Sequence, residues 1–142
     1  MAHKHERTYA RRTAVQVLYS LDVRNQTEYK RTPTDLIDSC ELDVVEGDLD
    51  EYAMRLIEGV WENKDKIDKE LDSLANNWAI DRMPLVDKNV LRVSAYELMH
   101  VEDVPVSVSI DEAVEIAKGF CGDDSPKFIN GILGALADKL GE

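Results

Sequence analysis

Apolar residues recur at intervals of three and four along most of the chain, which is the period of an α-helix. In the first segment this recurrence predicts a helix over about residues 7–23. Its apolar side is formed by Ala10, Ala14, Val17, Leu18 and Leu21. A short helix is expected at 34–40, after Pro33. Two further helices should follow, one opened by Asp48 and Glu51 and one capped by Asn63.

The second half of the chain is also predicted to be helical. Pro84 breaks the pattern, and apolar spacing then predicts a helix that reaches His100. The last helix should begin with Ser125 as its cap and Pro126 in the first helical position. Its apolar stripe comprises Ile129, Ile132, Leu133, Leu136 and Leu140.

The stretch VPVSVSI, residues 104–110, alternates apolar and polar residues as a strand would. However, Ser109 and Glu112 match a capping box, and the residues after them recur with helical period. No other segment could pair with such a strand, and strands need partners. We therefore predict a helix over about 110–121, with Gly122 ending it.

Together these elements predict an all-α protein of about six or seven helices. Short connections favour two small helical bundles that share one compact domain. A division near residues 76–84 would separate an N-terminal subdomain, 1–76, with a basic first helix, from a C-terminal bundle, 77–142.

The net charge of the 142-residue chain is −12, but the charge is unevenly distributed. Residues 1–31 carry seven lysines and arginines against three acidic residues, whereas the rest of the chain carries ten against twenty-six. The basic end could attract phosphate, and the acidic body could suit a basic protein partner. Alternatively, the acidic residues simply form solvated helix faces.

The start of the chain, its hydropathy and its cysteines predict a cytoplasmic protein. The start, MAHKHERTYARR, lacks the apolar core of a secretion signal, and no run approaches the roughly 18 apolar residues of a membrane span. Cys40 and Cys121 lie far apart and outside any CxxC spacing, which suits a reducing compartment. We expect no membrane partner.

The residue types that catalysis needs are sparse. No acid or cysteine is spaced to complete a metal site with His3 and His5, and His100 stands at a helix end. The glycines at 131 and 134 lie inside a predicted helix rather than in a phosphate-binding loop after a strand. The sequence therefore predicts a binding protein, not an enzyme, with no cofactor and no metal.

The first helix, with RRTAVQVLYSLD, is a candidate RNA surface. Away from its apolar side lie Thr8, Arg12, Val15 and Tyr19, flanked by Arg7 and Arg11. Guanidinium groups bind phosphates, and an aromatic ring can stack on an unpaired base, so this combination suits single-stranded RNA. The alternative is that Tyr19 completes the core and the arginines pair with the acidic body.

Phe128 lies off the apolar stripe of the last helix, beside Lys127 at the helix start. This pair repeats the combination of one charge and one flat ring. Asp123 and Asp124 would repel phosphate there. Alternatively, Phe128 packs against a neighbouring helix. Phe120, at the edge of its own stripe, has the same two interpretations, with packing favoured.

Three blocks resemble the NusB family of transcription antitermination factors: RRTAVQVLYSLD, VDKNVLRVSAYEL and VPVSVSIDEAVEIAKGFCGDDSPKFINGIL. The looser block LDEYAMRLIEGVWENKDKIDKEL extends the resemblance over most of the chain. It implies an all-helical fold and binding of boxA-type single-stranded RNA together with NusE, a small-subunit ribosomal protein. That complex helps RNA polymerase to resist termination on ribosomal RNA operons.

Position by position, the resemblance implies several site residues. The implied RNA contacts are Arg7, Arg11, Arg12, Tyr19, Phe120, Lys127 and Phe128. Asp124 would modulate RNA binding, and Asp87 would contact NusE. The arginines are more widely spaced than in the densest family pattern, because Thr8 and Tyr9 separate Arg7 from Arg11.

We therefore expect the start of the chain and the head of the last helix to form one outward platform. Two alternatives are the recognition module of a ribosomal RNA cytosine methyltransferase and a protein-only interaction module. A homodimer that covers the arginine face is a further possibility, because the exposed rings would form an apolar patch.

Overall fold

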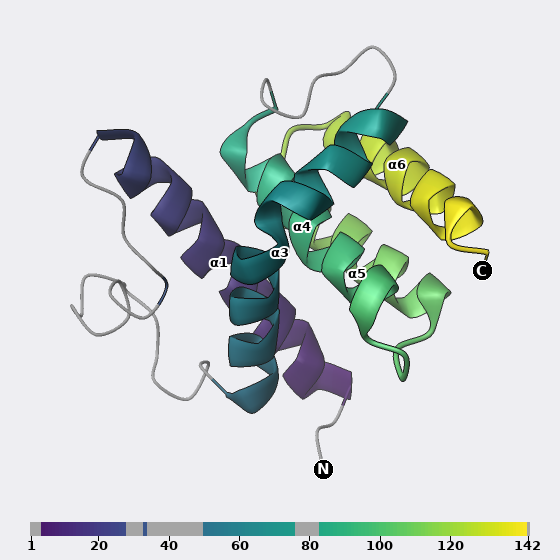
Figure 1. Cartoon of the computed structure of the whole chain (residues 1–142), viewed down its shortest axis with the longest axis horizontal. Coiled ribbons are helices and arrows are strands. Elements are labelled where there is room, and N and C mark those ends of the chain that lie inside the picture. The colour runs from purple at the N-terminus through teal and green to yellow at the C-terminus, as the bar shows by residue number, and fades with distance from the viewer. Residues whose placement is uncertain (1–3, 28–32, 34–49, 76–82, 142) are drawn as a thin grey trace.

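The computed structural model describes residues 4–27, 33, 50–75 and 83–141. Within these ranges five helices are present: α1 (Lys4–Thr27), α3 (Glu51–Leu74), α4 (Leu85–His100), α5 (Val106–Phe120) and α6 (Ser125–Lys139) (Figure 1). The predicted all-α class is confirmed. None of the described helices is long and apolar enough to cross a bilayer. The helix expected at 34–40 lies outside the described residues.

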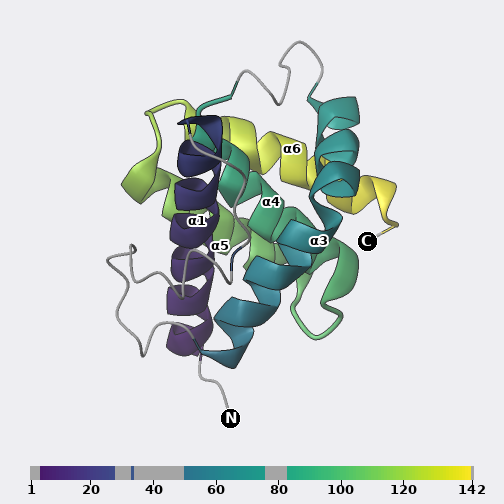
Figure 2. The same cartoon turned by 60° about the vertical axis from the view of Figure 1, so that its left-hand side comes forward.

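Helix α4 is the central element, because it packs against α1, α3, α5 and α6. Helix α1 lies on the outside of the arrangement in both views (Figures 1 and 2). Arg11 of α1 contacts Glu97 near the end of α4, whereas Asp22 contacts Asn89 near its start. Helix α1 is thus antiparallel to α4.

Helix α5 is also antiparallel to α4. Ser109, early in α5, contacts both Ser94 and Glu97 in the second half of α4. Cys121, directly after α5, bonds Asp87 in the first turn of α4. Because α1 and α5 both run against α4, they run parallel to each other.

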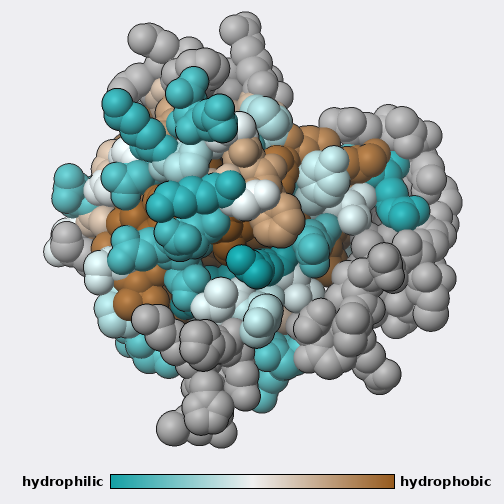
Figure 3. Space-filling view, turned by 180° about the vertical axis from the view of Figure 1, so that it is seen from behind, coloured by the Kyte–Doolittle hydropathy of each residue, from teal (hydrophilic) through white to brown (hydrophobic). Residues whose placement is uncertain are grey.

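Buried apolar residues from all five described helices form one core. The predicted apolar side of α1 is buried throughout, as are Ile129, Ile132, Leu133 and Leu136 of α6. Each buried valine, leucine or isoleucine among them contributes about 1.5–3 kcal/mol relative to leaving it in water. At the surface, hydrophilic residues are interleaved with apolar areas, as Figure 3 shows for the side opposite to Figure 1.

The boundary prediction in the middle of the chain was wrong. Residues 51–74 form one continuous helix instead of two. Asn63 is not a cap: its side-chain amide donates to the Gly59 carbonyl 2.8 Å away, one turn earlier in the same helix. The actual cap is Asp50, whose carboxylate accepts the Ala53 N–H at 2.8 Å.

Two predicted serine caps have other partners. Helix α5 begins at Val106, before the expected start, so Ser109 lies inside it and donates to Glu97 Oε1 at 2.8 Å. Ser125 is the first residue of α6, and its hydroxyl donates to Asp87 Oδ2 at 2.6 Å. In both cases a carboxylate from α4 attracts the hydroxyl, because a charged acceptor forms the stronger hydrogen bond.

Gly59 allows α3 and α4 to approach closely. A β-carbon at this position would overlap the ring of Tyr96 in α4. A glycine in the middle of a helix is otherwise unfavourable by about 1 kcal/mol relative to alanine. The close packing of Tyr96 against the α3 backbone explains its presence.

Candidate nucleic-acid interface

Arg11 lies inside the protein. Its side chain is 4% exposed, and its Nε lies 2.8 Å from Oε2 and 3.0 Å from Oε1 of Glu97, which is itself buried. A terminal guanidinium nitrogen lies 3.3 Å from Glu112 Oε1. The expectation of a solvent-facing Arg11 was therefore wrong. For this residue the alternative interpretation, pairing with the acidic body, describes the geometry.

Glu97 accepts hydrogen bonds from two further side chains. Tyr52 donates its hydroxyl to Oε2, and Ser109 donates to Oε1 at 2.8 Å. Burial raises the pKa of Tyr52 well above its ordinary value, and the charge of Glu97 raises it further. The phenol therefore remains protonated and available as a donor. The cluster connects α1, α3, α4 and α5.

Arg7 extends this cluster to the surface. Its guanidinium carbon lies 4.3 Å from the centroid of the Tyr52 ring, and a terminal nitrogen lies 3.1 Å from Asp103 Oδ2. About a quarter of its side chain is exposed. Arg7 is thus positioned by the protein but keeps part of its charged head in solvent.

The outward side of α1 carries Tyr9, Arg12, Gln16, Tyr19 and Val23, all exposed and spaced three and four residues apart. Tyr9 is 59% exposed and Tyr19 41%. Among the described residues no carboxylate pairs with Arg12. We call these five residues the outer stripe. It differs from the predicted second side, because Val15 is buried and Thr8 donates to Glu112 at 2.6 Å.

Helices α1 and α5 place two exposed rings at the same end of the molecule. Arg11 and Val15 of α1 line a small internal cavity together with Ala113 and Ile116 of α5. One further turn along each parallel helix leads from Val15 to Tyr19 and from Ile116 to Phe120. Phe120 is 50% exposed, so the preference for packing at this residue was wrong.

Asp87 lies at the same end, in the first turn of α4. It is buried, and it accepts the Ser125 hydroxyl at 2.6 Å. Burial raises the pKa of Cys121 to about 12, and its hydrogen bond to Asp87 contributes. Asp87 therefore holds the end of α5 and the start of α6 against α4, and most of its side chain is not open to solvent.

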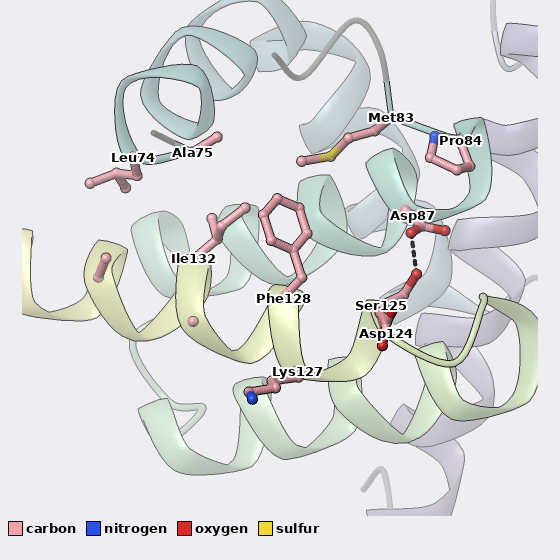
Figure 4. Close-up of a pocket in the computed structure, with 12 residues that line it drawn as sticks. Leu74, Ala75, Met83, Pro84, Asp87, Asp124, Ser125, Lys127, Phe128 and Ile132 are labelled. Atoms are coloured by element: carbon pink, nitrogen blue, oxygen red, sulfur yellow. Dashed lines mark hydrogen bonds between the residues drawn. The ribbon is translucent and has the colours of Figure 1, made fainter. Parts of the chain in front are cut away.

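Phe128 points into a pocket of about 710 Å³ between α6, the end of α3 and the start of α4. Figure 4 shows its ring beside Met83 and Ile132, whereas Lys127 points away from it. Phe128 is half-buried and packs against the core, so the alternative interpretation, packing against neighbouring helices, describes its geometry. Lys127 and Asp124 are exposed.

The start of α1 and the head of α6, which were expected to form one platform, lie near opposite ends of α4. Arg7 and Arg11 lie near the end of that helix, whereas the head of α6 docks near its start. Glu97 and Asp87, which mark the two places, are ten residues or about 15 Å apart along the helix. The second half of α1, with Tyr19, runs toward the α6 end, and Arg12 lies between the two groups.

Sequence reasoning missed a second buried arginine. Arg92 binds Asp22 and Asp68, with nitrogen–oxygen distances of 2.7 Å to each. Burial lowers its pKa, but the two carboxylates outweigh this and raise it. The signal was available in VDKNVLRVSAYEL, where charged residues interrupt an apolar helix. Among the described residues no group of three acids, histidines and cysteines could hold a metal.

These observations define a small all-helical protein in which buried ion pairs hold a scaffold that displays a cationic and aromatic helix face. The NusB family model matches residues 8–138, and the chain belongs to the NusB family. It is 40% identical over 132 residues to the transcription antitermination protein NusB of Streptomyces avermitilis, which covers 93% of this chain and 91% of that protein.

A second relative and two solved structures are also similar to this chain, and all of them are NusB proteins or contain one. The transcription antitermination protein NusB of Bacillus pumilus is 40% identical over 135 residues, covering 95% of this chain and 97% of the relative. The structure of T. maritima NusB has a TM-score of 0.79 at 32% identity and covers 98% and 94% of the two chains. A structure of antitermination factors NusB and NusE in complex with dsRNA has a TM-score of 0.77 at 25% identity, covering 96% and 99%.

Proposed function

We propose that this protein is a transcription antitermination factor that binds boxA-type RNA together with NusE. It acts by assembly in a complex with RNA polymerase, and not by catalysis. The relatives named transcription antitermination protein NusB support the proposal, as does the similar structure that contains NusB, NusE and RNA.

The observation that carries the RNA-binding proposal is the exposure of Tyr19 and Phe120 at one end of two parallel helices. Two flat rings at a solvent-facing edge can stack on unpaired bases. Arg12 lies two turns before Tyr19 on the same side of α1, and a guanidinium that no carboxylate of the described residues pairs with can bind a phosphate. The exposed Lys127 adds charge at the head of α6.

The other predicted residues hold the helices in place, alter the local charge or line the pocket. Arg11 fixes α1 to α4. The partly exposed Arg7 adds its positive charge at the edge of the same cluster. Asp124 is exposed at the head of α6, where its charge would weaken phosphate binding. Asp87 and Phe128 line the pocket between α6 and α4, and we assign this side to the protein partner.

The test is a titration of labelled boxA-type RNA with the protein, with and without NusE. Tyr19→Ala and Phe120→Ala should each weaken binding by about 1–3 kcal/mol if a base stacks on each ring. Leu140→Ala is the matched control, because Leu140 is also an exposed apolar residue but lies at the far end of α6. Unchanged affinity of both ring variants would contradict the assignment.

A further inference from the structure

Tyr9 is the most exposed of the large hydrophobic residues that the structure describes, and the function proposed above gives it no role. It lies on the outer stripe, ten residues before Tyr19, at a spacing that keeps both rings on one side of α1. A tyrosine that is 59% exposed gains little from packing. Packing in the core therefore does not account for its position.

The outer stripe has the chemistry of a single-strand track. Two flat rings, at Tyr9 and Tyr19, bracket the guanidinium of Arg12 and the amide of Gln16. No acidic residue interrupts the stripe, although the chain carries a net charge of −12. A polyanion with unpaired bases fits this pattern, whereas a basic protein would find no carboxylate to pair with.

Length also agrees with this assignment. Ten residues of helix span about 15 Å, so the two rings are separated by about four nucleotides at the stacked rise of 3.4 Å per nucleotide. Helix α1 lies on the outside of the described fold (Figure 2), and all five residues of the outer stripe are exposed along its length.

We propose that Tyr9 is a second base-stacking residue, and that bound RNA extends along the outer stripe from the Tyr19–Phe120 end toward the start of α1. This inference rests on the proposed RNA-binding function and adds a binding position to it. Arg12 would contact the phosphates between the two stacked positions.

The test compares Tyr9→Phe with Tyr9→Leu, because both keep an apolar side chain but only the first keeps a flat ring. With labelled boxA-type RNA and NusE, Tyr9→Leu should weaken binding by about 5- to 150-fold, which corresponds to the loss of one stacked base. Tyr9→Phe should bind like the unmodified protein. Leu140→Ala controls for loss of exposed apolar surface, and thermal unfolding checks that each variant is folded.

RNA length provides a second readout. Shortening the RNA by about four nucleotides from one of its two ends should abolish the difference between Tyr9→Leu and the unmodified protein. Shortening it from the other end should leave that difference intact. A merely structural role for Tyr9 would make the variant weak with every RNA.

The outcomes separate the two proposals. If the unmodified protein binds boxA-type RNA and Tyr9→Leu binds equally well, the role of Tyr9 is refuted and the proposed function stands. If the unmodified protein does not bind RNA even with NusE, both fail. If Tyr9→Leu changes only self-association in sedimentation velocity, the stripe is an interface between copies of the chain and the inference is overturned.

Discussion

Arg11 and Glu97 are separated by 86 residues in sequence, yet the Arg11 Nε lies 2.8 Å from a Glu97 carboxylate oxygen in the protein interior. Both side chains are almost fully buried. Because Glu97 also accepts hydrogen bonds from Tyr52 and Ser109, this carboxylate joins four helices at one point. An arginine expected at the RNA surface is thus a structural residue.

We predict that Arg11→Met destabilises the protein by about 3–5 kcal/mol, because removing one partner of a buried ion pair leaves an uncompensated charge. Urea unfolding measures the effect. Arg12→Met is the matched control: it changes the neighbouring, exposed arginine and should alter stability by less than about 0.5 kcal/mol. Similar losses for the two variants would show that Arg11 is not buried as described.

The salt dependence of RNA binding should distinguish the same two arginines. Arg12→Gln should reduce the slope of log K against log salt by about 0.7, the value for one phosphate contact on a single strand. Arg11→Gln should leave the slope unchanged under conditions where it remains folded. Affinity measured at several salt concentrations provides the comparison, and a lower slope for Arg11→Gln alone would reverse the assignment.

The helical class could be predicted because one side of each helix is buried, which imposes a period of three and four residues on the sequence. The caps could not. Ser109 and Ser125 have the right local sequence, but Glu97 and Asp87 lie far away along the chain and bind their hydroxyls in the fold. Local patterns do not encode such partners.

The candidate site could also be predicted only in part. The spacing of α1 identified Arg12 and Tyr19 as outward residues, and both are exposed. It placed Arg11 only beside that side of the helix, and it could not show that Glu97 and Glu112, far away along the chain, bind this arginine in the fold. Tyr9 was overlooked because it precedes the densest part of the motif, although its spacing from Arg12 placed it on the same side.

Cys121 should be unreactive in the folded protein. Its pKa is raised from 9.0 to about 12 by burial and by Asp87, so the reactive thiolate is nearly absent at pH 8. The folded state holds this proton more tightly than the unfolded state. The contribution to stability is therefore complete below pH 9 and is lost as the pH rises toward about 12.

Alkylation kinetics check this in a Cys40→Ser background, which leaves one thiol. We expect slow reaction of the native protein at pH 8 and much faster reaction in urea. Asp87→Asn should speed the native reaction, because it removes a negative charge that disfavours the thiolate. Asp124→Asn is the control, since Asp124 is exposed; equal acceleration by both variants would argue against a specific effect of Asp87.

Gly59 and Tyr96 should show strong coupling in a double-mutant cycle. In the native background, Gly59→Ala displaces the Tyr96 ring, which offsets the helix gain of about 1 kcal/mol. In a Tyr96→Ala background the same change should be stabilising by up to about that amount. Thermal or urea unfolding of the four proteins gives the coupling, and additive effects would mean that the ring does not limit this position.

The central place of α4 has a consequence for how the two halves of the chain depend on each other. A fragment ending at residue 75 would retain Arg11, Asp22 and Asp68 but lose the α4 side chains that bind them. Cutting the backbone between the halves should therefore yield two pieces that do not fold separately but regain structure when mixed. Even if the chain comprises two subdomains, they would form a single cooperative unit.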